Sequence, residues 1–292
     1  MNKGYFSIVF AALLLLSSSP VFAEDKVKVV TSFSILGDMV TQVTGDLAEV
    51  ETIVGPDADA HLYTPNAADA KAVTDAQVIF VNGLGFETWS QTLIENSGSE
   101  AQVFVATHGI TPLEVDGEID PHAWNALTNG MIYVDNIAKA MAQVDPGHAA
   151  TYEANAAAYS KRLQSMHDKA LKRLAALPED HRTVVTAHDA FGYLADAYGM
   201  TFLAPVGIDT EAEPSARELA ALIDHLKEVK AGALFVENIS SPALVEQISK
   251  ETGIGIGGRI YSDALSDRGG PATSYEKMFE HNLNTIIRAL GS

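Results

Sequence analysis

The chain has 292 residues, of which 47% are hydrophobic, and carries a formal net charge of -19 with no cysteine. The lack of cysteine excludes a disulfide framework and a lipid-modified cysteine. The negative charge disfavours nucleic acids and anionic lipids as partners, because both repel an acidic surface. It is compatible with a cationic ligand, and equally with solubility alone.

Residues 1–23 have the features of a secretory signal peptide: a basic start, an apolar run over residues 8–16 and small residues up to Ala23. We expect the mature chain to begin at Glu24. Because no cysteine could carry a lipid, we expect a protein that is free in the periplasm. No later apolar stretch reaches the roughly 20 residues that span a bilayer.

The rest of the chain is long enough for two lobes. We expect an N-terminal α/β lobe over residues 24–144, a long linking helix over residues 145–177 and a C-terminal α/β lobe over residues 178–292. Asp145-Pro146 is typical of a helix start, and the next proline is Pro178. At about 1.5 Å per residue, this helix would extend roughly 45 Å and run along both lobes.

Within the lobes, short β-branched segments alternate with amphipathic ones, which predicts mainly parallel sheets flanked by helices. In chain order, we expect strands at residues 26–33, 49–55, 76–83, 102–107, 183–188, 233–237 and 254–261 and helices at residues 65–74, 215–229, 242–252 and 274–290.

An internal repeat supports two pseudo-symmetric lobes. Val29-Val30-Thr31, with Gly37 after it, matches Val184-Val185-Thr186, with Gly192 after it. At the same offset, Phe80-Val81-Asn82 matches Phe235-Val236-Glu237. A third match aligns residues 54–61 with residues 206–213. Three matches in the same order are hard to obtain from a generic alternation of strands and helices.

Four residues at predicted strand exits form a candidate metal site: His61, His122, His188 and Asp263. Ligands of open parallel sheets bind beyond the carboxyl ends of the strands, so these side chains meet if the two sheet edges face each other. Three imidazoles and one carboxylate are a donor set that suits zinc.

The residues alone leave alternatives open. His108 directly follows a predicted strand and competes with His122, while Glu213 occupies the repeat position of His61 and competes with Asp263. Asp189 is a candidate acceptor that orients the neighbouring His188.

At these residues the chain resembles the metal-binding solute-binding proteins of ABC importers, of the zinc type called ZnuA. The resemblance covers essentially the whole mature chain. Its most specific segments are His61-Leu62-Tyr63-Thr64-Pro65, Asp120-Pro121-His122-Ala123-Trp124, Thr186-Ala187-His188-Asp189-Ala190-Phe191-Gly192-Tyr193, Glu213-Pro214-Ser215 and Tyr261-Ser262-Asp263-Ala264-Leu265.

The resemblance implies two lobes joined by one long rigid helix, with a buried metal held by His61, His122, His188 and Asp263. It also favours zinc, since manganese-type relatives usually carry glutamate at the position of His188. We therefore expect a monomer that captures one Zn²⁺ ion and delivers it to an inner-membrane ABC permease, without catalysis. A periplasmic zinc chaperone is a further possible partner.

Many zinc-type relatives carry a histidine-rich loop where this chain has a short acidic one, with Glu114, Asp116, Glu118 and Asp120. These carboxylates could collect cations or simply be solvated. A manganese or iron carrier of the same fold is the main alternative function. A zinc hydrolase with Glu213 or Asp189 as base is less favoured, because no HExxH-type motif is present, and an adhesin is the remaining class.

Overall fold

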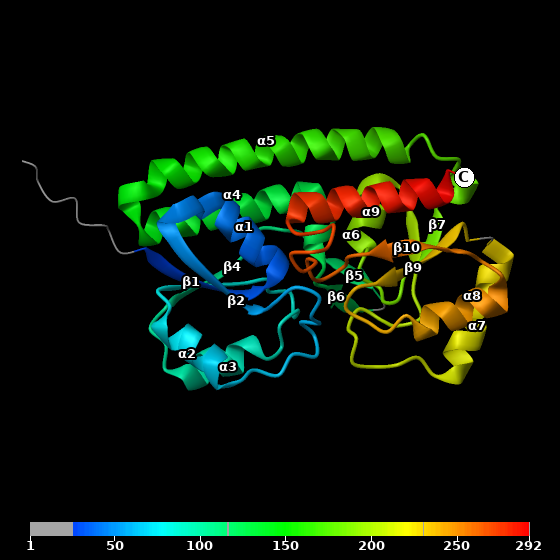
Figure 1. Cartoon of the computed structure of the whole chain (residues 1–292), viewed down its shortest axis with the longest axis horizontal. Helices are drawn as coiled ribbons and strands as arrows, with labels where there is room; N and C mark the ends of the chain where they lie inside the picture. The colour runs from blue at the N-terminus through cyan, green and yellow to red at the C-terminus, as the bar shows by residue number, and fades with distance from the viewer. Residues whose placement is uncertain (1–25, 116, 230, 292) are drawn as a thin grey trace, which may run out of the picture.

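The computed structural model describes residues 26–115, 117–229 and 231–291. It contains two four-stranded parallel sheets with helices on both sides of each (Figure 1). The predicted α/β class is thus confirmed. The expected signal peptide at residues 1–23 and Asp116 of the acidic loop lie outside the described residues. No helix in these described ranges is both long and apolar enough to cross a membrane.

The first sheet has the strand order β2-β1-β3-β4. Strand β3 is a continuous apolar run, and residues 29–33 of β1 are buried, because helices cover both faces of the sheet. Asn66 caps α2: its side chain accepts from Ala68 N–H, and Asp69 accepts from Asn66 N–H in return. The elements of this half are β1 (Val27–Phe33), α1 (Ser34–Thr44), β2 (Ala48–Val54), α2 (Ala67–Asp75), β3 (Val78–Val81), α3 (Ser90–Ser97) and β4 (Gln102–Val105).

The second sheet has the order β8-β7-β9-β10. In each half, the strand that comes second in the sequence lies at one edge of the sheet. The first, third and fourth strands follow it across the sheet in that order. This shared order is what the internal repeat predicts. The elements of this half are β7 (Thr183–Val185), α6 (Gly192–Tyr198), β8 (Thr201–Leu203), α7 (Ala216–Val229), β9 (Ala233–Glu237), α8 (Ala243–Thr252), β10 (Ile256–Ile260) and α9 (Tyr275–Leu290).

In the sequence, a small hairpin and two long helices separate the strands of the first sheet from those of the second. The hairpin of β5 (Leu113–Val115) and β6 (Glu118–Asp120) is antiparallel and occupies the place of the expected acidic loop. Helix α4 (Leu127–Val144) leads to α5 (Ala149–Leu174), whose 26 residues extend about 39 Å. Short 3-10 turns, Gly45–Leu47, Ala123–Asn125, Pro146–His148 and Glu179–His181, complete the fold.

Helix α5 runs along both halves of the molecule, above α4 and α9 (Figure 1). The largest apolar core lies beneath these helices and contains side chains from both halves, including Phe33, Tyr159, Phe235 and Tyr275. Each sheet also has a smaller apolar core on the face that points away from this large core. A shared core resists a wide separation of the halves, because such a motion would expose apolar surface. The lobe boundaries given above remain our proposal.

Candidate metal centre

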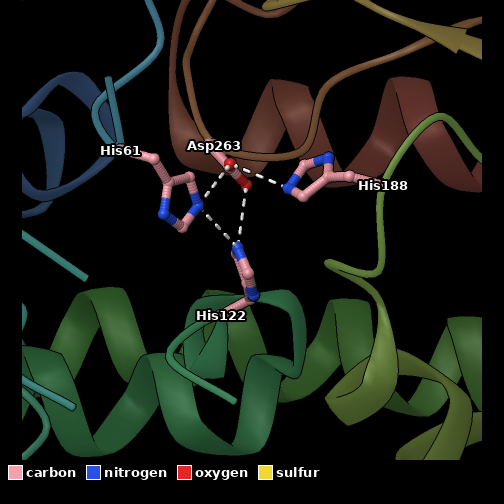
Figure 2. Close-up of side chains that lie close together, drawn as sticks. All are labelled: His61, His122, His188 and Asp263. Atoms are coloured by element: carbon pink, nitrogen blue, oxygen red, sulfur yellow. Dashed lines mark hydrogen bonds and ion pairs between the residues drawn. The ribbon is translucent and has the colours of Figure 1, made fainter. Parts of the chain in front are cut away.

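Four side chains from distant parts of the sequence converge between the two sheets (Figure 2). His61 lies in the segment between β2 and α2, and His122 directly follows the hairpin. His188 lies just beyond β7, where it bridges to Val206, and Asp263 lies between β10 and α9. The exposed fraction is 7% for His61 and 1% or less for the other three.

One donor atom from each residue lies within 4.8 Å of all the others. The Nε2 atoms of His61 and His122 are 3.1 Å apart. Asp263 Oδ2 lies 3.4 Å from His61 Nε2 and 3.1 Å from His188 Nε2, while Oδ1 lies 3.7 Å from His122 Nε2. Both carboxylate oxygens therefore face the imidazoles.

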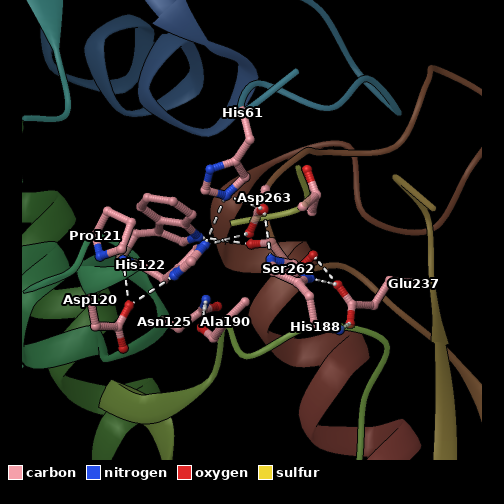
Figure 3. A network of polar contacts seen from close by, with 12 residues as sticks. His61, Asp120, Pro121, His122, Asn125, His188, Ala190, Glu237, Ser262 and Asp263 are labelled. Carbon is pink, nitrogen blue, oxygen red and sulfur yellow. Dashed lines mark hydrogen bonds and ion pairs between the residues drawn. The ribbon is translucent and has the colours of Figure 1, made fainter. Parts of the chain in front are cut away.

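Two of the histidines have a carboxylate behind the ring (Figure 3). Asp120 Oδ1 lies 2.8 Å from His122 Nδ1 and also accepts the backbone N–H of the same residue. Glu237 Oε2 lies 2.7 Å from His188 Nδ1. An acceptor at Nδ1 keeps the proton there and leaves Nε2 free to bind a cation, and it also fixes the ring orientation.

Glu237 is itself held firmly. Its Oε1 accepts backbone N–H groups from Ala187 and His188, and its Oε2 accepts the Ser262 hydroxyl at 2.6 Å. Only 2% of the residue is exposed. The side chain thus links the strand exit that carries His188 to the loop that carries Asp263.

The charges in this cluster support one another. Burial would lower the pKa of His188, but Glu237 and Asp263 outweigh it and hold that pKa well above its ordinary value. In His122, burial is likewise outweighed by Asp263 and Asp120, so the pKa is raised. Burial would raise the pKa of Asp263, yet the two imidazoles hold it well below its usual range. Protons and a cation therefore compete for the same nitrogens.

Aromatic rings form the wall on the side of the first sheet. The ring of Phe86 packs edge-on against His61, with centroids 4.7 Å apart, and against Phe33 and Trp124 behind it. Trp124 donates its indole N–H to the carbonyl of Ser262, next to Asp263, at 2.8 Å. These rings exclude water from one side of the cluster and connect the halves.

The remaining predicted site residues lie outside the cluster. His108 is exposed after β4, and Glu213 is exposed in the loop after β8. Asp189 is half-buried, and the carboxylate of Glu237 lies 2.7 Å from Nδ1 of His188. In the acidic segment, Glu114 and Glu118 are exposed, whereas Asp120 is buried against His122.

Sequence reasoning missed the role of Glu237, although the repeat had marked its position. Its counterpart Asn82 donates to the carbonyl of Pro121 at 2.9 Å, beside His122. Glu237 is the last residue of β9 and Asn82 directly follows β3, and each supports a histidine of the cluster. A polar side chain at this repeat position in both halves was the available signal.

The chain matches the family model described as zinc-uptake complex component A, periplasmic, over residues 29–289. It is 35% identical to the iron-binding protein YfeA of Yersinia pestis, covering 98% of this chain and 93% of that protein. It is 34% identical to the manganese-binding lipoprotein MntA of Halalkalibacterium halodurans, covering 99% of each. It is also 34% identical to the iron ABC transporter substrate-binding lipoprotein MtsA of Streptococcus pyogenes, covering 98% of this chain and 96% of that protein.

Solved structures agree with these relatives. The periplasmic zinc-binding protein TroA of Treponema pallidum matches with a TM-score of 0.87 at 29% identity, covering 91% of this chain and 99% of that one. A manganese-bound periplasmic metal-binding protein of Candidatus Liberibacter asiaticus matches with a TM-score of 0.83 at 33% identity, covering 91% and 100%. That protein has also been solved with cadmium.

The expectation of a protein free in the periplasm is contradicted by these names, because MntA and MtsA are called lipoproteins. We therefore withdraw that expectation. It had relied on the lack of cysteine, which remains a property of the sequence.

A buried group of three histidines and one aspartate that could hold a metal ion agrees with the metal-binding names of the relatives. The family match over nearly the whole chain and relatives at 34% to 35% identity show that the protein belongs to the ZnuA family, the metal-binding substrate-binding proteins of ABC transporters, which are not enzymes.

Proposed function

We propose that this protein captures zinc with His61, His122, His188 and Asp263 and delivers it to an ABC permease. The observation that carries this proposal is the convergence of three Nε2 atoms on one carboxylate, with all four donors mutually within 4.8 Å. Because one chain supplies all four donors, we also propose that the protein acts as a monomer. Loading by a chaperone stays a prediction.

The donor set and its dimensions support zinc. A tetrahedral zinc ion with bonds of about 2.0 to 2.1 Å to nitrogen places neighbouring donors about 3.3 Å apart. The distances from Asp263 and between His61 and His122, 3.1 to 3.7 Å, bracket this value. Imidazole nitrogen suits zinc, whereas manganese prefers a site rich in oxygen.

Manganese or iron is the second candidate, and one feature of the site favours it. Both oxygens of Asp263 face the imidazoles, so a bidentate carboxylate would give a fifth donor. Manganese prefers more than four donors, with oxygen atoms among them, whereas structural zinc is usually bound by four donors in a closed tetrahedron. The names of YfeA, MntA and MtsA agree with this alternative.

Metal titration tests the proposal. Metal-free protein is titrated with zinc, manganese and iron(II) against a competing chelator, and the protein as purified is analysed for its metal content. We expect one zinc ion per chain and the highest affinity for zinc. His61→Ala should abolish tight binding.

His108→Ala is the matched control, since it removes an exposed histidine outside the cluster. Equal affinity of the His61→Ala and His108→Ala proteins would refute the site. A higher affinity for manganese or iron than for zinc would refute the choice of metal and leave the site intact. If zinc is the bound metal, anomalous scattering at the zinc edge would identify metal and ligands together.

A further inference from the structure

His61 is held differently from the other two histidines. In the described part of the chain, no carboxylate lies at its Nδ1, whereas His122 has Asp120 and His188 has Glu237. Its ring contacts Phe86, and its backbone belongs to an irregular segment of residues 55–66. Its position therefore depends on what holds this segment.

Asp59 ties the backbone of His61 to the opposite half of the molecule. Its Oδ1 accepts the N–H of His61 at 2.8 Å and that of Leu62 at 3.4 Å. Its Oδ2 accepts the hydroxyl of Thr210, from the loop after β8, at 2.6 Å. A single carboxylate thus bridges the two halves directly beside a candidate ligand.

Asp57 makes a second bridge from the same segment. Its backbone N–H donates to the carbonyl of Leu265 at 2.9 Å. Its carboxylate accepts the Asn238 amide and the backbone N–H of Asp267, both at 3.0 Å. Asp57 has a φ of 54°, a left-handed conformation that aspartate tolerates better than most residues. The backbone turns there so that N–H and carboxylate both face the other half.

The segment is also the most accessible part of the site. His61 has the largest exposed fraction of the four clustered residues, and the neighbouring Leu62 is 54% exposed. His122, His188 and Asp263 are attached to elements that pack on the shared core beneath α4, α5 and α9. A cation that leaves past His61 would pass the most exposed of the four side chains.

We propose that Asp57 and Asp59, with their partners Thr210, Asn238, Leu265 and Asp267, form a latch that holds the His61 segment closed and sets the rate of metal release. The latch rests on the proposed function, because it presumes a metal bound at His61. It touches none of the four donor atoms. Opening it frees His61 while the other three side chains stay in place.

Thr210→Val tests the latch with the smallest change, because valine keeps the shape of threonine and lacks the hydroxyl that Asp59 accepts. Metal release from zinc-loaded protein is followed in a stopped-flow instrument after mixing with excess chelator. A hydrogen bond to a charged, partly exposed group suggests roughly 3- to 10-fold faster release. Thr210→Ser, which retains a hydroxyl, should release zinc at nearly the wild-type rate.

Two further variants complete the design. Asp57→Gly keeps the left-handed backbone and removes both side-chain bonds, so it should also release zinc faster. Thr201→Val changes an exposed threonine on β8 in the same half and should release zinc as the wild type does. In amide hydrogen exchange, Thr210→Val and Asp57→Gly should speed exchange at residues 55–62 and leave β1 and β3 unchanged.

The outcomes separate the two proposals. If the wild type binds zinc and both latch variants release it at the wild-type rate, the latch is wrong and the binding site stands. Faster exchange throughout the protein would also overturn the latch, because it would indicate a general loss of stability. If the wild type binds no metal, the proposed function fails, and the release role falls with it.

Discussion

Replacing Glu237 by glutamine should weaken zinc binding by roughly 10- to 100-fold, the usual cost of losing the acceptor behind a histidine ligand. Oε1 of Glu237 accepts two backbone N–H groups, so the amide oxygen of glutamine must take that position. The amide NH₂ then lies where Oε2 stands, 2.7 Å from Nδ1 of His188.

A donor at this point requires an unprotonated Nδ1, which moves the ring proton of His188 to Nε2. That nitrogen lies 3.1 Å from Asp263 and would have to lose its proton before binding zinc. A hydrogen bond to a charged group contributes about 1.5 to 3 kcal/mol, which corresponds to a change in affinity of roughly 10- to 150-fold. This range agrees with the expected loss of roughly 10- to 100-fold in zinc affinity.

Competition with a chelator of known affinity measures the zinc affinity, and thermal unfolding of the metal-free protein reports any loss of folding. Glu246→Gln is the matched control, since Glu246 is exposed on α8 in the same half. An affinity of Glu237→Gln within about threefold of the control would refute the orienting role of this carboxylate.

Three other predictions follow from the same site. His188→Glu should lower zinc affinity by at least the roughly 10-fold cost of a lost supporting bond and shift preference toward manganese; an unchanged preference in parallel titrations would contradict this. Because the pKa values of His188 and His122 are raised beside Asp263, both imidazoles must lose protons on binding. Affinity should therefore rise with pH between about pH 6 and about pH 8, by about one decade per pH unit for each proton released, and calorimetry showing a flat profile would refute the three-histidine site. In Gly192→Ala the new Cβ would meet Asp120 Oδ2 at 2.6 Å, so we expect a destabilisation of about 1 to 3 kcal/mol and weaker zinc binding; wild-type values in thermal unfolding and zinc titration would count against this contact.

Many strands and helices could be predicted from the sequence because strand ends and helix caps depend on neighbouring residues. The predicted strand at residues 233–237 coincides with β9, and the predicted helix at residues 274–290 differs from α9 only in its first residue. There Ser274 is the N-cap and accepts the N–H of Lys277. Strand exits also drew attention to the four clustered residues, but they left His108 and Glu213 as alternatives until the family resemblance favoured His122 and Asp263. The fold brings His61, His122, His188 and Asp263 together.

Other features depend on contacts that a sequence does not display. Helix α4 was absent from the predicted elements, and its first turns contain Gly130, which weakens a helical pattern. The structure gives the reason for this glycine, since a Cβ there would lie 2.6 Å from the hydroxyl of Tyr275 on α9. Likewise, the contact between Glu237 and His188 could be recognised only from the structure, because it depends on the direction in which the imidazole points.

The two kinds of support around the site lead to different consequences for transport. Glu237 and Asp120 act on the donor nitrogens, so changing them should alter how strongly the protein binds each metal and in what order. Thr210 and Asp57 contact no donor atom, so changing them should accelerate the release of zinc and manganese by the same factor. A protein that must bind tightly and still release its ion to a permease gains from this separation, because the release rate can change without a change in metal preference.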